Sequence, residues 1–367
     1  MYIIIRNMKI LFLTGRESSY PFNQVMIQLM RRFSTVTVPH EYGAGKSILK
    51  RSAQVLASAL PEIVSGNYDL IVVGFYGHLL MPPVRAITRT PILFNPFIST
   101  YDTLVFDRKK AAPGSVVGRL AFWLDQVACR AADHLLLDTH AHVSYFTRLF
   151  HLPPERFSVM PVGSDETMFY PRTVKTNAGH KTVLYYGNYL PLHGVDVVIQ
   201  AAKLLNDRSN IRFKMLGQGM EYARIHSLVK SLAIHNIDFC PSVPFDKLPD
   251  EIASADICLG GHFGASEKAA RVIAGKTYHS LAMGKATIVG DNDANRELLS
   301  HRHDAWFSPA DDPHALADAI FTLANDDTLR QQMGQNAHHT FMQRACLQVL
   351  EGQLKQVVEK TIASRRP

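Results

Sequence analysis

The chain has 367 residues, of which 47% are hydrophobic and 19% charged, so it is long enough for two packed domains and too apolar for a disordered protein. Its four cysteines are scattered without a C-x-x-C pair, which argues against a disulfide framework or a cysteine zinc site and fits a reducing compartment. The net charge of +7 lies almost entirely in the first half, since residues 1–173 hold 18 Lys and Arg against 12 Asp and Glu, while the remainder holds 21 against 20. This basic half either attracts an anionic substrate or membrane face, or only keeps the protein soluble.

No apolar run reaches the roughly 18–20 residues that span a bilayer. The apolar start, Met1 to Ile5, meets Arg6 too soon to be a secretion signal. We therefore expect a cytoplasmic protein, with the inner face of the cell membrane as an alternative location. The basic residues are not interleaved with aromatic residues on a recognisable module, so we expect no nucleic-acid partner.

Short apolar runs recur along the chain, and each is followed by a segment of helical period. Continuous Val, Ile and Leu runs separated by helices indicate parallel sheets that are covered on both faces. Two such series predict an α/β protein with two doubly wound, Rossmann-like domains. The predicted strands are Lys9–Thr14, Thr35–Pro39, Leu70–Gly74, Pro91–Asn95, His134–Asp138, Thr182–Gly187, Arg212–Gly217, Asp238–Cys240, Ile257–Gly260, Ala286–Val289 and Ala305–Phe307.

The divide between the domains falls in a stretch rich in turn formers and without periodicity, between Val159 and Lys181. We expect a first domain over residues 1–170 and a second over residues 171–345. A favourable helix start at Asp311-Asp312-Pro313 opens a region that reads as helical to its end. Residues 346–367 are expected to pack back on the first domain.

Three segments of the second half place glycines and loops after predicted strands. Val183–Gly194 reads as a strand and a glycine-containing loop before a helix, a geometry that directs backbone N–H groups at phosphate. Phe213–Gly219 is a buried strand that ends in glycines, which either let a ligand approach the backbone or close a turn. Val243 opens a loop, a short helix and another strand that carry no chemistry of their own.

The segment Ser266–Lys285 is the most informative one. A short helix closed by Gly284 begins at Lys276, and Lys268 and Arg271 bring further positive charge to its N-terminus. Cations there oppose the helix dipole and lower the stability of the helix unless an anion binds. A diphosphate would supply that anion; the alternative is that these are solvated surface charges.

The order and spacing of these segments resemble the retaining glycosyltransferases of GT-B fold, of the group 1 or family 4 type. The resemblance implies two Rossmann-like domains with a cleft between them and a C-terminal crossover helix. It further implies transfer of a hexose-type sugar from a nucleotide-diphosphate sugar to a hydroxyl acceptor (a glycan, glycolipid or lipid-linked intermediate), with retention and with no metal or other cofactor. The matching motifs are Val159–Pro171, Leu216–Gly219, Ala255-Asp256 and Leu281–Lys285.

This sequence departs from the family pattern at the charged positions. The family's Arg and Lys that hold the diphosphate correspond to Asn188 and His193, and its two glutamates spaced E-x7-E correspond to Arg271 and His279. Neutral His193 could still donate a hydrogen bond. Either the basic residues around Lys276 take over neutralisation of the diphosphate, or donor binding is altered or lost.

Candidate residues of the first half also follow strand ends, where ligands bind in parallel sheets. Gly15 and Arg16 follow the first strand, His78 follows Leu70–Gly74, and Asn95 ends the next strand. We predict that these four contact the acceptor; His78 either orients the acceptor hydroxyl or is an ordinary surface histidine. The predicted catalytic residues are His78, Arg271 and Lys276, and the predicted donor-binding residues are Gly187, Asn188, His193, Gly217, Val243, Lys268, Arg271, Lys276, Tyr278 and His279.

The segment Ser115–Ala131 mixes apolar and aromatic residues with Arg119 and Arg130, and follows Arg108-Lys109-Lys110. It predicts either a basic-aromatic contact with an anionic membrane or an ordinary core helix with a basic approach.

If the resemblance holds, the implied mechanism is front-face displacement, in which cations and helix-end N–H groups stabilise the leaving diphosphate. Two alternatives remain open, a nucleotide-sugar epimerase on the same fold and a non-catalytic glycosyltransferase-like protein that binds sugar nucleotides. A dehydrogenase would need G-x-G-x-x-G after the first strand, where Gly15 stands alone.

Overall fold

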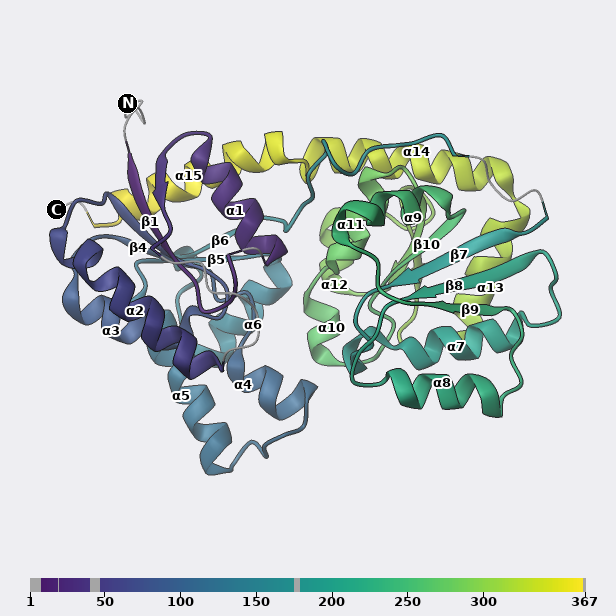
Figure 1. Ribbon diagram of the computed structural model, residues 1–367, viewed down its shortest axis with the longest axis horizontal. Coiled ribbons are helices and arrows are strands. Elements are labelled where there is room, and N and C mark those ends of the chain that lie inside the picture. Colours follow the sequence, from purple (N-terminus) through teal and green to yellow (C-terminus); the bar gives the residue numbers. More distant parts are fainter. Residues whose placement is uncertain (1–7, 19, 40–46, 175–178, 366–367) are drawn as a thin grey trace. The chain divides into compact units, whose positions relative to one another are not determined.

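The computed structural model describes residues 8–18, 20–39, 47–174 and 179–365, so the apolar start discussed above lies outside the described residues. The chain forms two compact units (Figure 1). Unit 1 comprises residues 1–162 and 347–367, and unit 2 comprises residues 163–346. The turn-rich stretch between residues 159 and 181 contains the first crossing between the units.

Unit 1 is built on a parallel six-stranded sheet of order β2-β1-β3-β4-β5-β6. Its strands are β1 (Lys9–Leu13), β2 (Thr35–Thr37), β3 (Leu70–Val73), β4 (Ile92–Phe94), β5 (His134–Leu137) and β6 (Phe157–Val159). Its helices are α1 (Pro21–Arg31), α2 (Ile48–Ser65), α3 (Met81–Ile87), α4 (Thr100–Asp102), α5 (Val116–Ala131), α6 (His140–Phe150) and α15 (Leu347–Ala363), with single turns η1 (Gly77–Leu79), η2 (Thr103–Asp107) and η3 (Pro154–Arg156).

Both faces of this sheet are buried, as continuous apolar strands require. Leu11 and Leu13 of β1 face the cluster that contains α2, α3 and α6, whereas Ile10 and Phe12 face the cluster that contains α1 and α15. Helix α15 contributes leucines at helical spacing, beginning at Leu347. Each such buried side chain contributes about 1.5–3 kcal/mol.

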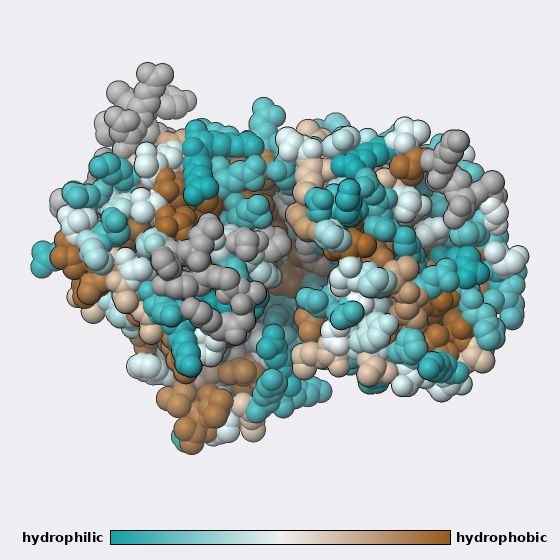
Figure 2. Space-filling view, viewed as in Figure 1, coloured by the Kyte–Doolittle hydropathy of each residue, from teal (hydrophilic) through white to brown (hydrophobic). Residues whose placement is uncertain are grey.

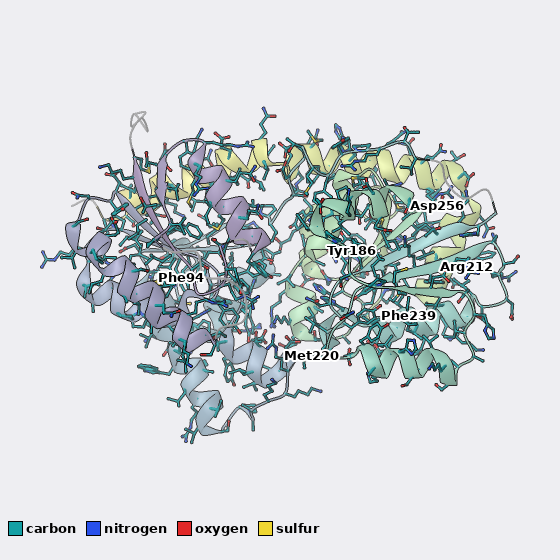
Figure 3. All side chains as sticks on the ribbon, viewed as in Figure 1. Phe94, Tyr186, Arg212, Met220, Phe239 and Asp256 are labelled. Carbon is teal, nitrogen blue, oxygen red and sulfur yellow. The ribbon has the colours of Figure 1, made fainter. Side chains whose placement is uncertain are left out.

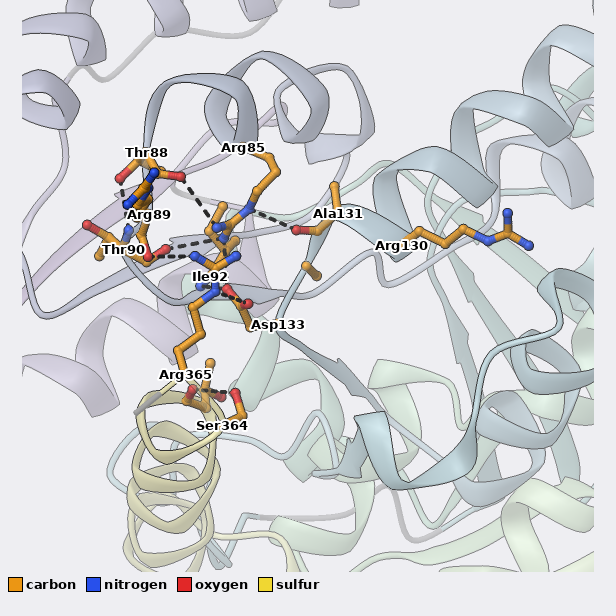
Figure 4. Close-up of polar contacts among 12 residues, drawn as sticks. Arg85, Thr88, Arg89, Thr90, Ile92, Arg130, Ala131, Asp133, Ser364 and Arg365 are labelled. Atoms are coloured by element: carbon orange, nitrogen blue, oxygen red, sulfur yellow. Dashed lines mark hydrogen bonds and ion pairs between the residues drawn. The ribbon is translucent and has the colours of Figure 1, made fainter. Parts of the chain in front are cut away.

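The end of α15 is also fixed to unit 1 by charge (Figure 4). The Arg365 guanidinium donates to Asp133 Oδ1 at 2.6 Å, and Arg85 donates to the second oxygen of the same carboxylate at 2.8 Å. Asp133 also accepts from the backbone N–H of Ile92, at the start of β4. The last helix of the chain is therefore a structural part of the first unit.

Unit 2 is built on a second parallel six-stranded sheet, of order β12-β11-β10-β7-β8-β9. Its strands are β7 (Lys181–Tyr186), β8 (Ile211–Leu216), β9 (Ile237–Cys240), β10 (Ile257–Gly261), β11 (Ala286–Gly290) and β12 (Trp306–Ser308). Its helices are α7 (Val195–Leu204), α8 (Tyr222–Ser231), α9 (Leu248–Ser254), α10 (Glu267–Arg271), α11 (Gly275–Ala282), α12 (Asp293–Leu298), α13 (Pro313–Asn325) and α14 (Asp327–Arg344), with single turns η4 (Pro191–His193) and η5 (Phe245–Lys247).

These two sheets confirm the predicted fold class, and each predicted strand is present. The sequence did not reveal β6, which lies directly before the turn-rich divide and is not a continuous apolar run, since Ser158 interrupts it. The predicted helix start at Asp312 is correct, since its side chain accepts a hydrogen bond from the N–H of Ala315. Within the described part of the chain, no helix is long and apolar enough to cross a membrane.

The strand orders determine where a ligand is expected to bind. In unit 2 the neighbours β7 and β10 are separated in the chain by β8 and β9, and in unit 1 the neighbours β1 and β3 are separated by β2. At such a switch point the connections leave in opposite directions, and a crevice opens at the carboxyl ends of the strands. The predicted site residues should gather at these two edges.

Candidate active site

Two glycines lie at the switch point of unit 2. Gly187 and Gly217, which follow β7 and β8, both have positive φ angles, of 133° and 122°. A Cβ on Gly217 would collide with the carbonyl oxygen of Gly187, so the two loops pack directly on each other. Without a side chain, Gly187 leaves space beside the backbone at the end of β7, directly after Tyr186, which Figure 3 labels.

Lys276, in the first turn of α11, occupies this opening. Its side chain is buried, and its Nζ has no hydrogen-bond partner among the described residues. The Nζ lies 4.0 Å from the centre of the Tyr185 ring and 3.8 Å from where a Cβ on Gly187 would stand. Burial lowers the pKa of Lys276 to about 7. A buried ammonium without a partner is costly in free energy, and an anion placed beside it would remove that cost.

Two buried histidines lie near Lys276. The ring centres of His193 and His262 are 5.2 Å apart, and His193 Nδ1 lies 2.6 Å from the carbonyl oxygen of Asn188. Burial lowers the pKa of both histidines, to about 3 for His262, and the positive charges of Lys276 and Lys268 lower them further. Both rings are therefore neutral near pH 7.

The tautomer of His193 decides which hydrogen bonds it can make. Because a carbonyl oxygen only accepts, the contact with Asn188 requires the proton of neutral His193 to be on Nδ1. The Tyr185 hydroxyl lies 3.0 Å from the same nitrogen. Nε2 is then an acceptor, so His193 can receive a hydrogen bond from a hydroxyl and can donate to a phosphate only after it gains a proton.

The cations of α10 differ from each other in their surroundings. Arg271 is buried and forms an ion pair of 3.1 Å with Glu267, which lies one helical turn earlier and is 83% exposed. Lys268 is half-buried and its charge acts on both His193 and His262. The structure thus brings Lys268 and Lys276 together, while the charge of Arg271 is already balanced by a carboxylate.

His279 lies one turn after Lys276 on α11 and belongs to an aromatic shelf. Its ring stacks on Phe169 at 4.1 Å with an interplanar angle of 5°, and Phe245 contacts it edge-on. Its Nδ1 is 3.0 Å from the Tyr186 hydroxyl, and burial lowers its pKa to about 4. Phe169 is itself fully buried, so this stack of neutral rings supports the site from inside the core of unit 2.

The remaining donor-side predictions lie apart from this group. Tyr278 is fully buried, and by helical period its side chain leaves α11 on the face opposite Lys276. Val243 lies half-buried in the loop after β9, the outermost strand of that side of the sheet.

The switch point of unit 1 is narrow at the backbone level. The N–H of Gly15 donates to the carbonyl of Phe75 at 3.2 Å, and a Cβ on Gly15 would collide with the carbonyl oxygen of Tyr76. The neighbouring Arg16 is held by Glu17, with Nε and Oε2 3.0 Å apart. The loops after β1 and β3 are thereby joined, and only glycine fits at position 15.

A buried polar cluster follows β3 and β4. His78 is 2% exposed, and its Nε2 lies 3.6 Å from Asp125 Oδ1 on α5. The second oxygen of Asp125 accepts from the Ser99 hydroxyl at 2.7 Å and from the N–H of Tyr101. Asn95 is fully buried, and neither atom of its amide has a hydrogen-bond partner within the described ranges. Burial raises the pKa of Asp125 and lowers that of His78.

These groups suit a neutral hydroxyl ligand. Buried polar atoms are nearly always hydrogen-bonded, so the amide of Asn95 and Oδ1 of Asp125 have bonding capacity to spare, whereas His78 also interacts with the backbone of Ile98. His78 is not the surface histidine that the sequence left as an alternative. Across the described parts of both units, no three His, Cys, Asp or Glu side chains converge as a metal site would require.

Comparison with known proteins shows which family unit 2 resembles. The family model for glycosyl transferases group 1 matches residues 169–340, which lie inside unit 2. Unit 2 therefore resembles the group 1 glycosyltransferases in sequence. It is 23% identical over 178 residues to the putative colanic acid biosynthesis glycosyltransferase WcaL of Escherichia coli, covering 48% of this chain and 44% of that one.

Two further proteins resemble this chain over more of its length. The phosphatidyl-myo-inositol mannosyltransferase of Mycobacterium leprae is 24% identical over 311 residues, covering 80% of this chain and 74% of that one. The structure of Anabaena HepE in complex with UDP is similar to this one, with a TM-score of 0.73 and 16% sequence identity. The similarity covers 96% of this chain and all of that one, so the two proteins share the GT-B fold. The chain spans roughly half or less of the length of most curated relatives that it matches.

The candidate site includes residues that the sequence did not single out. His262 and Asp125 are the main ones, and Tyr185 and Phe169 support their predicted neighbours. The signal for Asp125 was its position on the helix Val116–Ala131, since an aspartate there falls among the small residues of the buried face. His262 follows two glycines at a strand end, the same pattern that drew attention to Gly187.

Proposed function

We propose that this glycosyltransferase moves a hexose from a nucleotide-diphosphate sugar to a hydroxyl group of a glycan or lipid-linked acceptor, with retention and without a metal ion. The observation that carries the proposal is the buried Lys276 ammonium, which has no hydrogen-bond partner in the described chain and lies at the switch point of unit 2. The N-terminus of α7 follows the same loop, and helix N-termini and ammonium groups both favour phosphate.

Lys276 takes the place of the cations that the family pattern has at Asn188 and His193. Its pKa of about 7 means that the free protein holds this side chain partly neutral. A bound diphosphate raises that pKa, so that the ammonium is charged when the donor is present. Neutral His193 then offers Nε2 to a donor hydroxyl.

The chemical step exchanges one bond at the anomeric carbon for another. The bond to the diphosphate oxygen breaks, and the acceptor oxygen bonds to the same face of the sugar. The proton of the acceptor hydroxyl passes to the departing diphosphate oxygen, so no protein nucleophile is consumed. Lys276 stabilises the charge that grows on the leaving group, and His78 with Asp125 and Asn95 orients the acceptor hydroxyl.

The relatives support the substrate classes. HepE is described in complex with UDP, and the mycobacterial relative is named for phosphatidyl-myo-inositol as its acceptor. WcaL is named for the biosynthesis of colanic acid. A nucleotide donor and a lipid-linked or glycan acceptor are consistent with the cationic edge of unit 2 and the neutral, hydroxyl-binding edge of unit 1.

The test is a screen of UDP-, GDP- and dTDP-hexoses in the presence of EDTA. We expect one nucleotide class to raise the melting temperature, nucleotide release only after an acceptor is added, and a product with the donor's anomeric configuration by NMR. Stabilisation by none of them would refute donor binding and favour the non-catalytic alternative. Conversion of the donor sugar without an acceptor would identify an epimerase instead.

A further inference from the structure

The first turns of α5 and the preceding turn η2 expose large apolar side chains to solvent. Val116, Val117, Leu120 and Trp123 are 64%, 55%, 59% and 58% exposed, and Phe106 of η2 is 51% exposed. Figure 2 shows hydrophobic residues gathered on unit 1 where Figure 1 places the first turns of α5. We call these five residues the α5 patch.

Helical geometry separates the α5 patch from the core. Residues 116, 117, 120 and 123 share one side of α5, whereas Gly118, Ala121 and Asp125 are buried on the other. The first turns of α5 project from the sheet of unit 1 (Figure 1). The patch is thus an extra apolar surface and not the inner face of a core helix.

Positive charge surrounds the α5 patch. Arg108, Lys109, Lys110 and Arg119 are exposed, and none of the four forms an ion pair with a described residue. Between residues 103 and 123 the only acidic residue is Asp107. Exposed apolar and aromatic side chains flanked by unpaired cations match the interface of an anionic bilayer, where Trp prefers the headgroup level.

We propose that the α5 patch docks unit 1 on the surface of an anionic phospholipid membrane. Val116, Val117, Leu120 and Trp123 enter the headgroup region, and the four cations contact lipid phosphates. A protein partner or a second copy of the chain would cover the apolar residues equally well, but neither explains a ring of cations without carboxylate partners.

The position of the α5 patch links docking to the acceptor. Asp125, which faces His78, lies on α5 only two residues after Trp123. Arg108 is close enough to Tyr76, two residues before His78, for its charge to act on that hydroxyl. Docking therefore brings the hydroxyl-binding edge of unit 1 to the lipid surface, which suits an acceptor linked to a lipid; this last step rests on the proposed function, whereas docking itself does not.

The test uses the full chain and the intrinsic fluorescence of Trp123. The chain has two tryptophans, so Trp306→Phe leaves Trp123 as the only one. On adding vesicles of phosphatidylglycerol and phosphatidylcholine, we expect a blue shift and quenching by brominated acyl chains, both reversed by high salt. Vesicles of phosphatidylcholine alone should bind at least tenfold more weakly.

Variants separate the apolar and the charged contributions. Leu120→Ser with Val117→Ser should lower the vesicle partition coefficient about tenfold or more, and Lys109→Gln with Lys110→Gln about fivefold for each charge removed. The matched control is Val64→Ser, since Val64 on α2 is 67% exposed but carries no such ring of cations. All variants should keep the nucleotide-induced rise in melting temperature, which reports on unit 2.

Three outcomes would overturn the proposal. They are Trp123 fluorescence unchanged by anionic vesicles, equal binding to neutral vesicles, and binding that the patch variants leave intact. A dimer in solution that dissociates in Leu120→Ser would also contradict it, because the patch would then be an interface between copies. None of these readouts involves sugar transfer, so failure here and failure of the proposed function are distinguishable.

Discussion

The two units share one architecture but differ at the edges where their ligands are expected. Each has six parallel strands with helices on both faces and a switch point in the strand order. At the switch point of unit 2, glycines surround a buried ammonium with two neutral histidines beside it. At that of unit 1, an aspartate, a histidine and an asparagine are buried with open hydrogen-bonding positions.

This difference indicates a division of labour within one kind of fold. A site that must hold an anion needs positive charge that nothing else has neutralised, which is the condition of Lys276. A site that must orient a neutral hydroxyl needs hydrogen-bond partners of fixed direction, which is the condition of His78 and Asn95. Variants in unit 2 should therefore change donor affinity, and variants in unit 1 should change turnover at constant donor affinity.

The largest effect is expected for Lys276→Met, which keeps the length of the side chain and removes the charge. We expect the Kd of the nucleotide donor to rise roughly hundredfold and kcat/KM to fall about a thousandfold, because no other unpaired cation in the described chain is buried at this edge. Calorimetric titration and steady-state kinetics measure the two effects.

Two controls accompany Lys276→Met. The variant should melt no lower than the parent without ligand, because it removes a buried charge that lacks a partner. Lys181→Met removes a cation from the opposite end of the same strand β7, where Lys181 is paired with Asp327 at 3.1 Å. Its donor affinity should be unchanged; equal losses in both variants would refute the assignment.

The second largest effect is expected for a variant of unit 1, and it concerns kcat. His78→Gln should lower kcat about a hundredfold and leave the nucleotide Kd unchanged, because His78 lies in unit 1 and is assigned to the acceptor. If this variant does not fold, Asp125→Asn keeps the shape of the partner and tests the same cluster. A donor affinity that falls in parallel with kcat would contradict the division of labour.

Donor binding should depend on pH through Lys276. The pKa of about 7 in the free protein is lowered by burial and rises when the diphosphate binds, so binding takes up a proton above pH 7. Affinity should be constant below about pH 7 and fall by up to tenfold per pH unit above it. The pKa values of His193 and His262 are lowered, so these residues remain neutral throughout that window.

Calorimetry in buffers of different ionisation enthalpy measures that proton uptake directly. Lys276→Arg keeps a cation that cannot lose its proton, so it should bind the donor without the slope above pH 7. A slope that persists in Lys276→Arg would mean that another group titrates.

Much of the fold and part of the difference between the two units could be predicted from the sequence. The strands could be predicted because their buried runs of Val, Ile and Leu are continuous. The cations of residues 268–276 could be identified as candidates because they oppose a helix dipole. Gly187 and Gly217 were found from their positions after strands, and the structure packs them directly together.

What could not be predicted depended on contacts between distant segments. Asp125 belongs with His78 only because α5 packs against η1, the turn that holds His78, 47 positions earlier in the chain. The pKa of Lys276 follows from its burial beside the ends of β7 and β10, which no local pattern records. The pairing of Arg271 with Glu267 was predictable in principle, since residues four apart share a helix face.

That pairing gives the smallest effect and the finest test of which cations serve the donor. Arg271→Gln should weaken donor binding by only about threefold to fivefold, because Glu267 already balances its charge and is itself open to solvent. Glu267→Gln should have the opposite sign and tighten binding slightly, since it releases the positive charge of Arg271. The double variant should then fall close to the Arg271→Gln value, and a double-mutant cycle by calorimetry isolates the coupling. If Arg271→Gln lost as much donor affinity as Lys276→Met, Arg271 would itself contact the diphosphate. The positive charge that binds the donor would then come from both α10 and α11, and not from the Lys276 ammonium alone.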